Sequence, residues 1–181
     1  MRHLMLLSTS TVHGSGYLEY AIPHLQEFLG DCRSILFIPW ARPGGITPQR
    51  YTELFHKHLA PAGFNVSGLH EADDPVAAVA AAESIYVGGG NTFVLLRTLY
   101  ESGVVRPLRE RVAEGMPYMG SSAGANVAGQ SIGTTNDMPI VYPPSFDALG
   151  LVPFNINPHY LDPDPDSTHM GETRETRIGE F

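Results

Sequence analysis

Cysteine and lysine are almost absent from this chain of 181 residues, which contains only Cys32 and Lys57. A lone cysteine can form no internal disulfide, and it cannot supply a cluster of thiolate ligands for a metal ion. Acidic residues outnumber basic ones by 19 to 11, which gives a formal net charge of −8. Nucleic acids and anionic membranes bind clustered positive charge, and no segment gathers the arginines into a patch. We therefore expect neither of these partners.

Long hydrophobic runs are also missing. The N-terminal run Leu4–Leu7 has only four apolar residues, whereas a signal peptide needs about 7 to 15 and a membrane span about 20. A buried first strand explains this run better. Hydrophobic residues make up 43% of the chain and charged residues 17%, as in ordinary globular proteins. These features predict a cytoplasmic protein with a sizeable core.

Short apolar runs alternate with longer amphipathic segments, which is the pattern of a mostly parallel sheet covered by helices on both faces. The expected strands are Leu4–Leu7, Ile35–Trp40, Asn65–Leu69, Ser84–Val87, Tyr118–Gly120 and Leu151–Ile156. The expected helices are Tyr17–Leu29, Pro48–Leu59, Pro75–Ala82, Phe93–Tyr100, Val104–Ala113 and Ala123–Ala128. Because neither a repeat nor a long linker divides the chain, we predict one doubly wound α/β domain over residues 1–181.

Two regions fall outside this alternation. The segment Gly133–Ala148 is rich in proline and poor in helix formers, so we expect a long loop, and long loops in compact domains are often functional. The segment Leu161–Ser167 indicates a stiff acidic connector. A helix is expected from Gly171, and the sequence stops within it, whereas a doubly wound domain would normally return to the sheet. This predicts a fragment of a longer protein.

The segment Gly120–Gly124 has the pattern Gly-x-Ser-x-Gly, with Ser122 at its centre. It follows a short apolar run and precedes small residues that can start a helix, which is the setting of a nucleophile elbow. The glycines would let the strand and the helix meet closely, and the turn would aim N–H groups at an oxyanion beside Ser122. The alternative is a glycine-rich turn with an incidental serine, because short motifs often occur by chance.

A second glycine cluster, Gly88–Thr92, follows the expected strand that ends at Val87. It lacks the Lys-Ser/Thr pair of a P-loop and the spacing of a dinucleotide fingerprint, which argues against a phosphate site. A loop at the carboxyl end of a central strand can instead supply a second N–H group to an oxyanion hole.

Among the eight histidines, His159 has the most suggestive position, because it follows a proline at the end of the last expected strand. The other seven, which include His169, have weaker contexts. Asp137 lies between Ser122 and His159, so the chain order is Ser…Asp…His, as in α/β hydrolases. A histidine base needs a carboxylate that fixes its tautomer and stabilises the imidazolium. The alternative role for Asp137 is to cap a turn.

Taken together, these residues resemble a known family. Five segments occur in the same order as in peptidase E, the α-aspartyl dipeptidases, and weaker similarity covers most of the remaining chain. They are Gly88–Phe93, Ser122–Asn126, Thr134–Ile140, Asn157–His159 and Gly171–Glu175. Any one of these motifs is unspecific, but five in register are specific. The resemblance implies a serine peptidase with a fold similar to that of class I glutamine amidotransferases.

The resemblance also implies roles for individual residues. Ser122 would be the nucleophile and His159 the base, with Asp137 as the family's proposed charge-relay aspartate. The N–H groups of Gly90 and Ala123 would together form the oxyanion hole.

Arg174 matches the arginine that the family associates with the aspartate side chain of the substrate, and Asn91 is also assigned to substrate binding. A guanidinium binds a carboxylate bidentately and stays charged, so one arginine can bind an acidic ligand in an acidic protein. The implied function is hydrolysis of Asp-X dipeptides with an N-terminal aspartate. The implied partner is a small peptide, without a metal or other cofactor, and the protein would be a monomer or a homodimer.

The sequence departs from the family in two respects. Family members continue beyond the position of Phe181 and include there a glutamate that has also been assigned to the triad. Either Asp137 or that missing acid would therefore orient His159, and in the second case the loop Gly133–Ala148 would shape the substrate pocket. Met170 stands where relatives carry a lysine, which would weaken the positive charge near the substrate.

Two other functions remain open at this point. The first is a different hydrolase of the same superfamily, cyanophycinase-like or an esterase, because the elbow does not dictate the acyl group. Arg174 argues against an esterase, which would need no cation there. The second is a non-catalytic binding domain similar to the amidotransferases, and the presence of Ser122, Asp137 and His159 argues against it.

Overall fold

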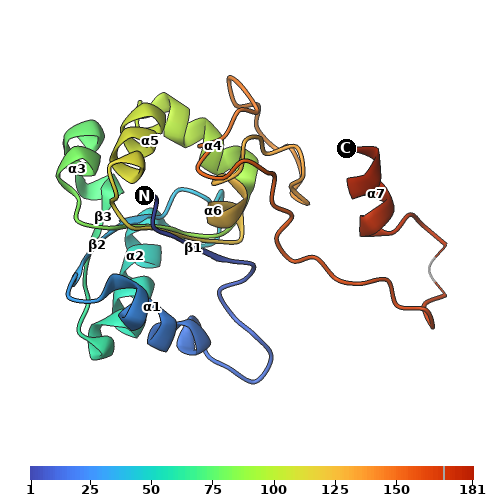
Figure 1. Cartoon of the computed structure of the whole chain (residues 1–181), viewed down its shortest axis with the longest axis horizontal. Coiled ribbons are helices and arrows are strands. Elements are labelled where there is room, and N and C mark those ends of the chain that lie inside the picture. Colours follow the sequence, from blue (N-terminus) through green and yellow to red (C-terminus); the bar gives the residue numbers. More distant parts are fainter. Residues whose placement is uncertain (169) are drawn as a thin grey trace.

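The backbone forms a five-stranded sheet in which all neighbouring strands are parallel. The computed structural model describes residues 1–168 and 170–181, so His169 lies outside the described residues. The strands are β1 (Leu4–Leu7), β2 (Ser34–Ile38), β3 (Asn65–Gly68), β4 (Ile85–Val87) and β5 (Tyr118–Ser121). Their order across the sheet is β1-β5-β4-β2-β3, which places β4 and β5 in its interior (Figure 1).

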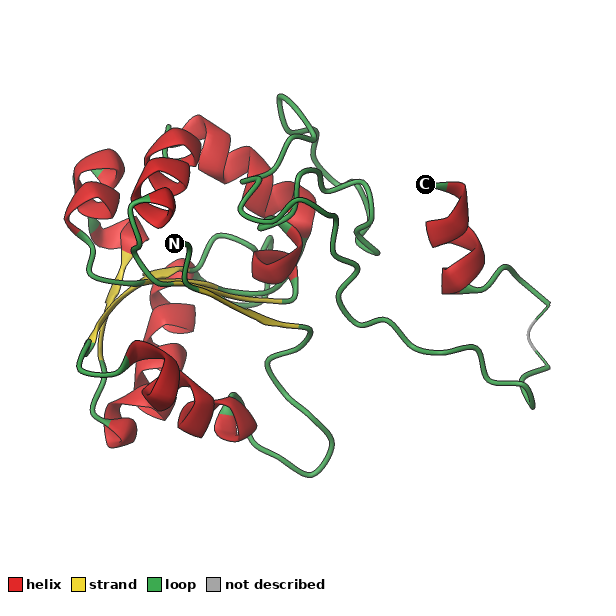
Figure 2. Ribbon diagram, viewed as in Figure 1, coloured by secondary structure: helices red, strands yellow, loops and turns green. Residues whose placement is uncertain are grey.

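Helices cover both faces of this sheet, as Figures 1 and 2 show. One face carries α1 (Ile22–Leu29) and α2 (Pro48–Leu59). The other face carries α3 (Pro75–Ala81), α4 (Thr92–Glu101), α5 (Val105–Ala113) and α6 (Ala123–Asn126). Short 3-10 helices occur at Glu19–Ala21, Ala60–Ala62 and Leu69–Glu71. The doubly wound α/β fold that the sequence predicts is thus confirmed.

Alternate side chains of the strands enter two separate hydrophobic cores. In β2, Ile35 and Phe37 pack with residues of α1 and α2, whereas Leu36 and Ile38 pack with residues of α3, α4 and α5. Successive residues of a strand point to opposite faces of a sheet. Burial on both faces is the reason why β2 and β4 are continuous apolar runs in the sequence.

The expected strand Leu151–Ile156 is wrong, because these residues form bends and irregular backbone outside the sheet. The N–H groups of Leu151 and Val152 both donate to the carbonyl of Ala128, at 2.9 and 3.2 Å. These residues therefore bond to the chain just after α6 rather than to a strand edge.

The helix expected over Tyr17–Leu29 is shorter in the structure, where a loop and a 3-10 turn precede α1. The long loop Gly133–Ala148 and the connector Leu161–Ser167 are confirmed as segments without a helix or strand. The final helix, α7 (Arg174–Glu180), begins after the expected Gly171, because the side chain of Thr173 caps it by accepting from the N–H of Thr176. It follows an extended segment that leads away from the sheet (Figure 1).

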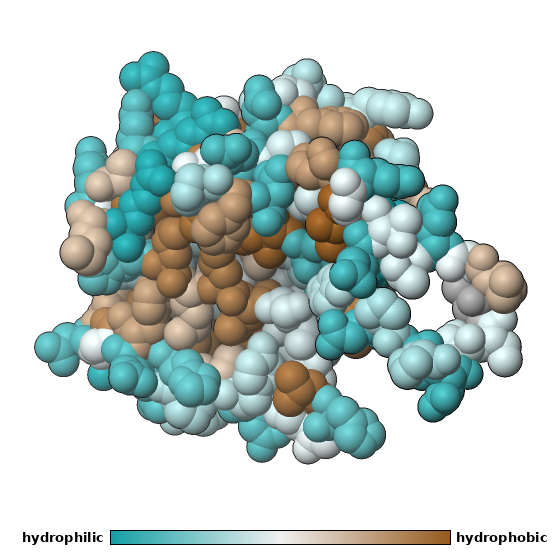
Figure 3. Space-filling model, turned by 45° about the vertical axis from the view of Figure 1, so that its right-hand side comes forward, coloured by the Kyte–Doolittle hydropathy of each residue, from teal (hydrophilic) through white to brown (hydrophobic). Residues whose placement is uncertain are grey.

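β1 forms one edge of the sheet, and its residues Leu4–Leu7 are half-buried. In the space-filling view, hydrophobic residues gather at the level of the sheet, between hydrophilic residues above and below (Figure 3). Within the described residues, no helix is both long and apolar enough to cross a membrane.

Candidate active site

The chain turns sharply from β5 into α6 at Ser122, whose φ is 53° and ψ is −114°. Residues with a side chain rarely adopt a positive φ, so this backbone is strained. The N–H of Ser122 donates to the carbonyl of Leu7 at 3.0 Å, and its own carbonyl accepts from Ala125 and Asn126, both at 2.9 Å. β1 and α6 therefore hold the turn from both sides at the carboxyl edge of the sheet, as in a nucleophile elbow.

Close packing around this turn requires glycine at positions 120 and 124. A Cβ atom added to Gly120 would lie 2.3 Å from the carbonyl oxygen of Gly124, and one added to Gly124 would lie 2.1 Å from that of Val87. Both distances are far shorter than van der Waals contact. The hydroxyl of Tyr118 donates to the Gly124 carbonyl at 2.7 Å. Burial raises the pKa of Tyr118, so this donor keeps its proton.

The imidazole of His159 approaches Ser122 from a distant part of the sequence. Its Nε2 lies 2.9 Å from the Oγ of Ser122, within hydrogen-bond distance. His159 also has a positive φ, 59°. Its N–H donates to the Oγ of Ser8 at 2.8 Å, and its carbonyl accepts from the guanidinium of Arg174. An imidazole bonded to a serine hydroxyl can take the hydroxyl proton, which is how a serine becomes a nucleophile.

Three asparagines brace the segment that carries this imidazole. Asn126 and Asn136 donate to the carbonyls of Ile156 and Pro158, and Asn157 donates to the Oδ1 of Asn136 at 3.0 Å. The sequence assigned them no role, although all three lie in segments that resemble peptidase E. A side-chain amide has no reactivity that would mark it as a brace before its partner is known.

The loop after β4 lies against the elbow. A Cβ atom on Gly89 would lie 2.9 Å from the Cβ of Ser122, and one on Gly90, whose φ is 149°, would lie 2.1 Å from the carbonyl oxygen of Ala41. Only glycine fits this approach. Among the described residues, the N–H groups of Gly90 and Ala123 donate no hydrogen bond. Such free N–H groups can bind a developing oxyanion.

The carboxylate of Asp137 bonds to the start of α4. Its Oδ2 accepts from the N–H and the Oγ1 of Thr92, both at 2.7 Å, and from the Oγ1 of Thr135 at 3.1 Å. In the described part of the chain, no hydrogen bond joins Asp137 to His159. A carboxylate at a helix N-terminus satisfies an otherwise unpaired N–H and interacts favourably with the helix dipole.

Asn91 caps the same helix. Its Oδ1 accepts from the N–H of Val94 at 3.1 Å, and its Nδ2 donates to the carbonyl of Met138 at 2.9 Å. Asn91 and Asp137 thus tie the long loop to the start of α4 by bonds in both directions. They also fix the backbone that directly follows Gly90.

A pocket of about 560 Å³ lies between the long loop and α7. Its wall includes Asp137 and Asn157 on one side, and Arg174, Arg177 and Phe181 on the other. Arg174 is half-buried, and it joins this pocket to His159 through the bond to the carbonyl of that residue. A cation is therefore present where an acidic side chain could be bound.

Within the described residues, no group of three or more His, Cys, Asp and Glu side chains could hold a metal ion. The arrangement of Ser122, His159 and two free N–H groups can carry out acyl transfer with side chains and backbone alone.

Comparison with known proteins agrees with this chemistry. The model of peptidase family S51 matches residues 4–181. The "Probable alpha-aspartyl dipeptidase" of Drosophila melanogaster is 54% identical over 183 residues, which cover 99% of this chain and 75% of that protein. The "Peptidase E" of Streptomyces coelicolor is 54% identical over 179 residues, with coverages of 99% and 72%. The "Peptidase E" of Salmonella heidelberg is 50% identical over 180 residues, with coverages of 98% and 77%.

Solved structures show the same relationship. A crystal structure named "Putative Peptidase E Protein", from Listeria monocytogenes, superposes with a TM-score of 0.76 at 29% sequence identity, and covers 99% of this chain and 87% of that one. The structure of a peptidase from an acI-B1 actinobacterium shares the fold, with a TM-score of 0.61 at 22% identity and coverages of 82% and 64%. The family match over nearly the whole chain and the high identity to these relatives lead to one conclusion: the chain belongs to peptidase family S51.

Proposed function

We propose that this protein is a serine dipeptidase that hydrolyses Asp-X dipeptides. The observation that carries the proposal is the 2.9 Å contact between the Oγ of Ser122 and the Nε2 of His159 at a strained elbow. Membership of peptidase family S51 supports peptide-bond hydrolysis. The names of the relatives, at 50% and 54% identity, support the aspartyl dipeptide as substrate.

In the first half of the proposed reaction, the Oγ of Ser122 attacks the carbonyl carbon of the aspartyl residue while His159 takes the hydroxyl proton. The carbonyl π electrons move to the oxygen, and the N–H groups of Gly90 and Ala123 stabilise the resulting oxyanion. The intermediate collapses when the C–N bond breaks and His159 gives its proton to the leaving amine. Residue X departs as a free amino acid, and the aspartyl group remains as an ester on Ser122.

In the second half, a water molecule takes the place of the leaving amine. His159 removes a proton from the water as it attacks the ester carbonyl, and the same two N–H groups bind the second oxyanion. Breaking the ester bond releases aspartate, and His159 returns the proton to Ser122. The enzyme is then restored without any external reductant or oxidant.

Arg174 is proposed to bind the side-chain carboxylate of the substrate's aspartate. Its guanidinium carries five N–H donors, and one of its nitrogens already bonds to the carbonyl of His159. Arg174 also lines the pocket, so one residue would both bind the carboxylate and set its position relative to His159. This link between binding and chemistry supports discrimination against glutamate, in which an extra methylene would misplace the scissile carbonyl.

For Asp137 and Asn91 we propose positioning roles. From the sequence, either Asp137 orients His159, or another acid does so and the long loop shapes the substrate pocket. The bonds of Asp137 to Thr92 and Thr135 support the second alternative. The side-chain bonds of Asn91 support a role in fixing the backbone that carries the Gly90 N–H, next to the substrate.

Hydrolysis assays with four peptides test the proposed function. Asp-Leu should be cleaved with the highest kcat/KM, and Leu-Leu and Glu-Leu should be poor substrates. N-acetyl-Asp-Leu tests whether a free N-terminal amine is needed, and leucine release measured by amino-acid analysis serves all four peptides. Cleavage of Leu-Leu as fast as Asp-Leu would contradict the aspartyl specificity, and no release of leucine from Asp-Leu would contradict the function itself.

A further inference from the structure

Arg42 is an arginine without a polar partner among the described residues of an acidic protein. Each of the other nine arginines forms an ion pair with a carboxylate or donates to a backbone carbonyl. Within the described residues, Arg42 does neither. Its guanidinium carbon instead lies 5.2 Å from the ring centre of Tyr51, which is a cation–π contact. In a chain with a net charge of −8, such a cation is available for an anionic ligand.

Arg42 lies at a second pocket of about 420 Å³, built by the loops that follow β1 and β2. Its wall is mostly apolar, with Tyr17, Tyr51, Ile46 and Leu54, and it also includes Ser10, Thr11, Gly44 and Gly45. None of these residues lines the pocket of Arg174. An apolar wall with one cation at its rim suits a small molecule that has an apolar body and one negative charge.

The hydroxyl of Tyr17, at the wall of this pocket, is buried, and its one polar neighbour that affects its pKa by hydrogen bonding is the hydroxyl of Tyr51, with which it forms no well-aligned hydrogen bond in the described part of the chain. A buried hydroxyl without a partner is costly, so a polar ligand atom here would be favoured. Burial is the main cause that raises the pKa of Tyr17, and the positive charge of Arg42 lowers this pKa by a smaller amount. The phenol therefore stays neutral and can donate to an anion.

Tyr51 connects this pocket to the elbow. Its hydroxyl accepts from the N–H of Gly89 at 3.1 Å and donates to the carbonyl of the same residue at 3.3 Å. Gly89 in turn packs so closely on Ser122 that an added Cβ would lie 2.9 Å from the Cβ of the serine. Two successive contacts, from Tyr51 to Gly89 and from Gly89 to Ser122, thus link this pocket to the elbow.

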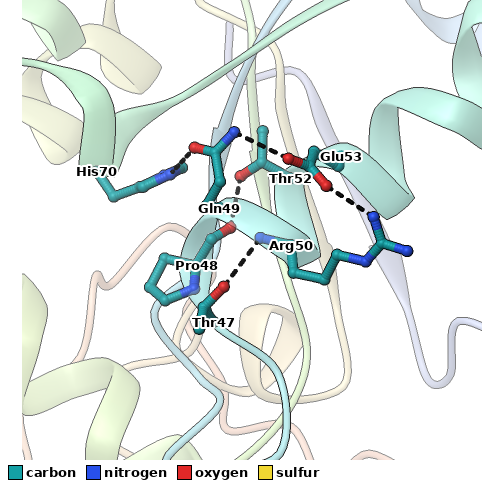
Figure 4. A network of polar contacts seen from close by, with 7 residues as sticks. All are labelled: Thr47, Pro48, Gln49, Arg50, Thr52, Glu53 and His70. Atoms are coloured by element: carbon teal, nitrogen blue, oxygen red, sulfur yellow. Dashed lines mark hydrogen bonds and ion pairs between the residues drawn. The ribbon is translucent and has the colours of Figure 1, made fainter.

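A network of hydrogen bonds surrounds the start of α2, the helix that carries Tyr51 (Figure 4). Thr47 caps the helix by accepting from the N–H of Arg50 at 3.2 Å. Figure 4 also shows the side chain of Gln49 beside the imidazole of His70, which belongs to the 3-10 helix after β3. The Oε1 of Gln49 lies 3.1 Å from the Nε2 of His70. These bonds hold the start of the helix that carries Tyr51, and preorganisation of this kind lowers the entropic cost of binding.

We propose that this second pocket binds the leaving residue X of the dipeptide, with its apolar side chain against Tyr17, Ile46 and Leu54 and its C-terminal carboxylate on Arg42. The inference rests on the proposed dipeptidase function and extends it to the other half of the substrate. The pocket of Arg174 and the pocket of Arg42 would each hold one residue and one carboxylate. Recognition of a free C-terminus by Arg42 makes the enzyme favour dipeptides over substrates whose C-terminus is blocked or extended.

The test compares Asp-Leu with its C-terminal amide, Asp-Leu-NH₂, which keeps the scissile bond and removes the charge. The wild-type enzyme should cleave Asp-Leu with a kcat/KM about tenfold higher than the amide, because Arg42 is exposed and its ion pair is partly screened. Arg42→Met should lower the value for Asp-Leu about tenfold and that for the amide much less, so that the preference disappears. Arg42→Lys should keep part of it.

Arg106→Met serves as the matched control, because Arg106 is an exposed arginine whose one ion pair in the described part of the chain is with Glu110 on α5. It should leave the preference for the free carboxylate intact. Equal losses for both substrates in Arg42→Met, or no preference in the wild type, would overturn the assignment of this pocket while leaving the dipeptidase function standing. If the wild type cleaves neither substrate, the dipeptidase function falls and the assignment falls with it.

Discussion

Asp137 and Thr92 are joined by two hydrogen bonds of 2.7 Å, one from the backbone N–H and one from the hydroxyl of the threonine. Both bonds end on the same carboxylate oxygen, which also accepts from Thr135. The pair therefore anchors the long loop to the first turn of α4, next to the loop after β4 that carries Gly90. This geometry supports the proposal that Asp137 positions other groups.

Asp137→Asn should therefore destabilise the fold more than it impairs chemistry. The loss of charge-assisted bonds at a helix N-terminus should cost about 1 to 2 kcal/mol of unfolding free energy. The kcat for Asp-Leu should fall by less than about 100-fold, whereas removal of a triad acid costs about 10⁴-fold. Thermal unfolding and steady-state kinetics measure the two effects.

Asp147→Asn, in the same loop, is the control, because the exposed side chain of Asp147 accepts no hydrogen bond in the described part of the chain. A 10⁴-fold loss of kcat in Asp137→Asn with an unchanged melting temperature would support the charge-relay role instead.

Backbone strain at Ser122 leads to a prediction about stability. Ser122→Gly and Ser122→Ala should both be inactive, but the glycine variant should be the more stable of the two. Glycine adopts a positive φ without steric cost, whereas alanine keeps the Cβ that strains a residue at 53°. We expect a difference of about 1 kcal/mol or more in the unfolding free energy, measured by urea denaturation. Equal stability of the two variants would show that the elbow is not strained in solution.

Close packing at Gly124 gives a further prediction. Gly124→Ala should lose activity and about 1 to 3 kcal/mol of stability, because the new Cβ would meet the Val87 carbonyl at 2.1 Å and push α6 away from β4. Gly179→Ala is the control, since a Cβ there meets nothing within 4 Å. Circular dichroism during heating, together with the Asp-Leu assay, compares the variants. A Gly124→Ala protein as stable and active as the control variant would contradict the packing described here.

The proposed role of Arg174 leads to a prediction about aspartyl specificity. Its pairing with a partly desolvated carboxylate should be worth about 2 to 5 kcal/mol, a preference of roughly 30-fold to several thousandfold for Asp-Leu over Leu-Leu. Arg174→Ala should remove most of this preference, and Arg174→Lys should keep a part, because lysine lacks the planar fork. Competition assays with both peptides give the ratio directly. An unchanged ratio in Arg174→Ala would mean that another group, such as Arg177 at the same pocket, binds the carboxylate.

The fold could be predicted from the sequence wherever burial on both faces leaves an uninterrupted apolar run, as in β2 and β4. The same criterion failed at Leu151–Ile156, because an apolar segment that packs beside α6 has the composition of a strand. Only the pairing partner distinguishes the two, and pairing over long sequence separations is not encoded in a local pattern.

The site could be predicted in part for a similar reason. The elbow at Ser122 depends on neighbouring residues, so its pattern is visible in the sequence, and the family resemblance indicated His159. The partner of Asp137 could not be found this way, since Thr92 is 45 residues distant. The isolation of Arg42 also becomes visible only when the partners of all other arginines are known.

The most direct test of the proposed mechanism is the rate of leucine release from Asp-Leu by the wild type and by Ser122→Ala. Removal of the Oγ eliminates the proposed nucleophile but leaves the N–H groups of Gly90 and Ala123 and the pocket of Arg174 in place. We expect kcat to fall by about 10⁴-fold or more, with an unchanged circular dichroism spectrum. A Ser122→Ala enzyme that releases leucine at a rate near that of the wild type would contradict the assignment of Ser122 as the nucleophile.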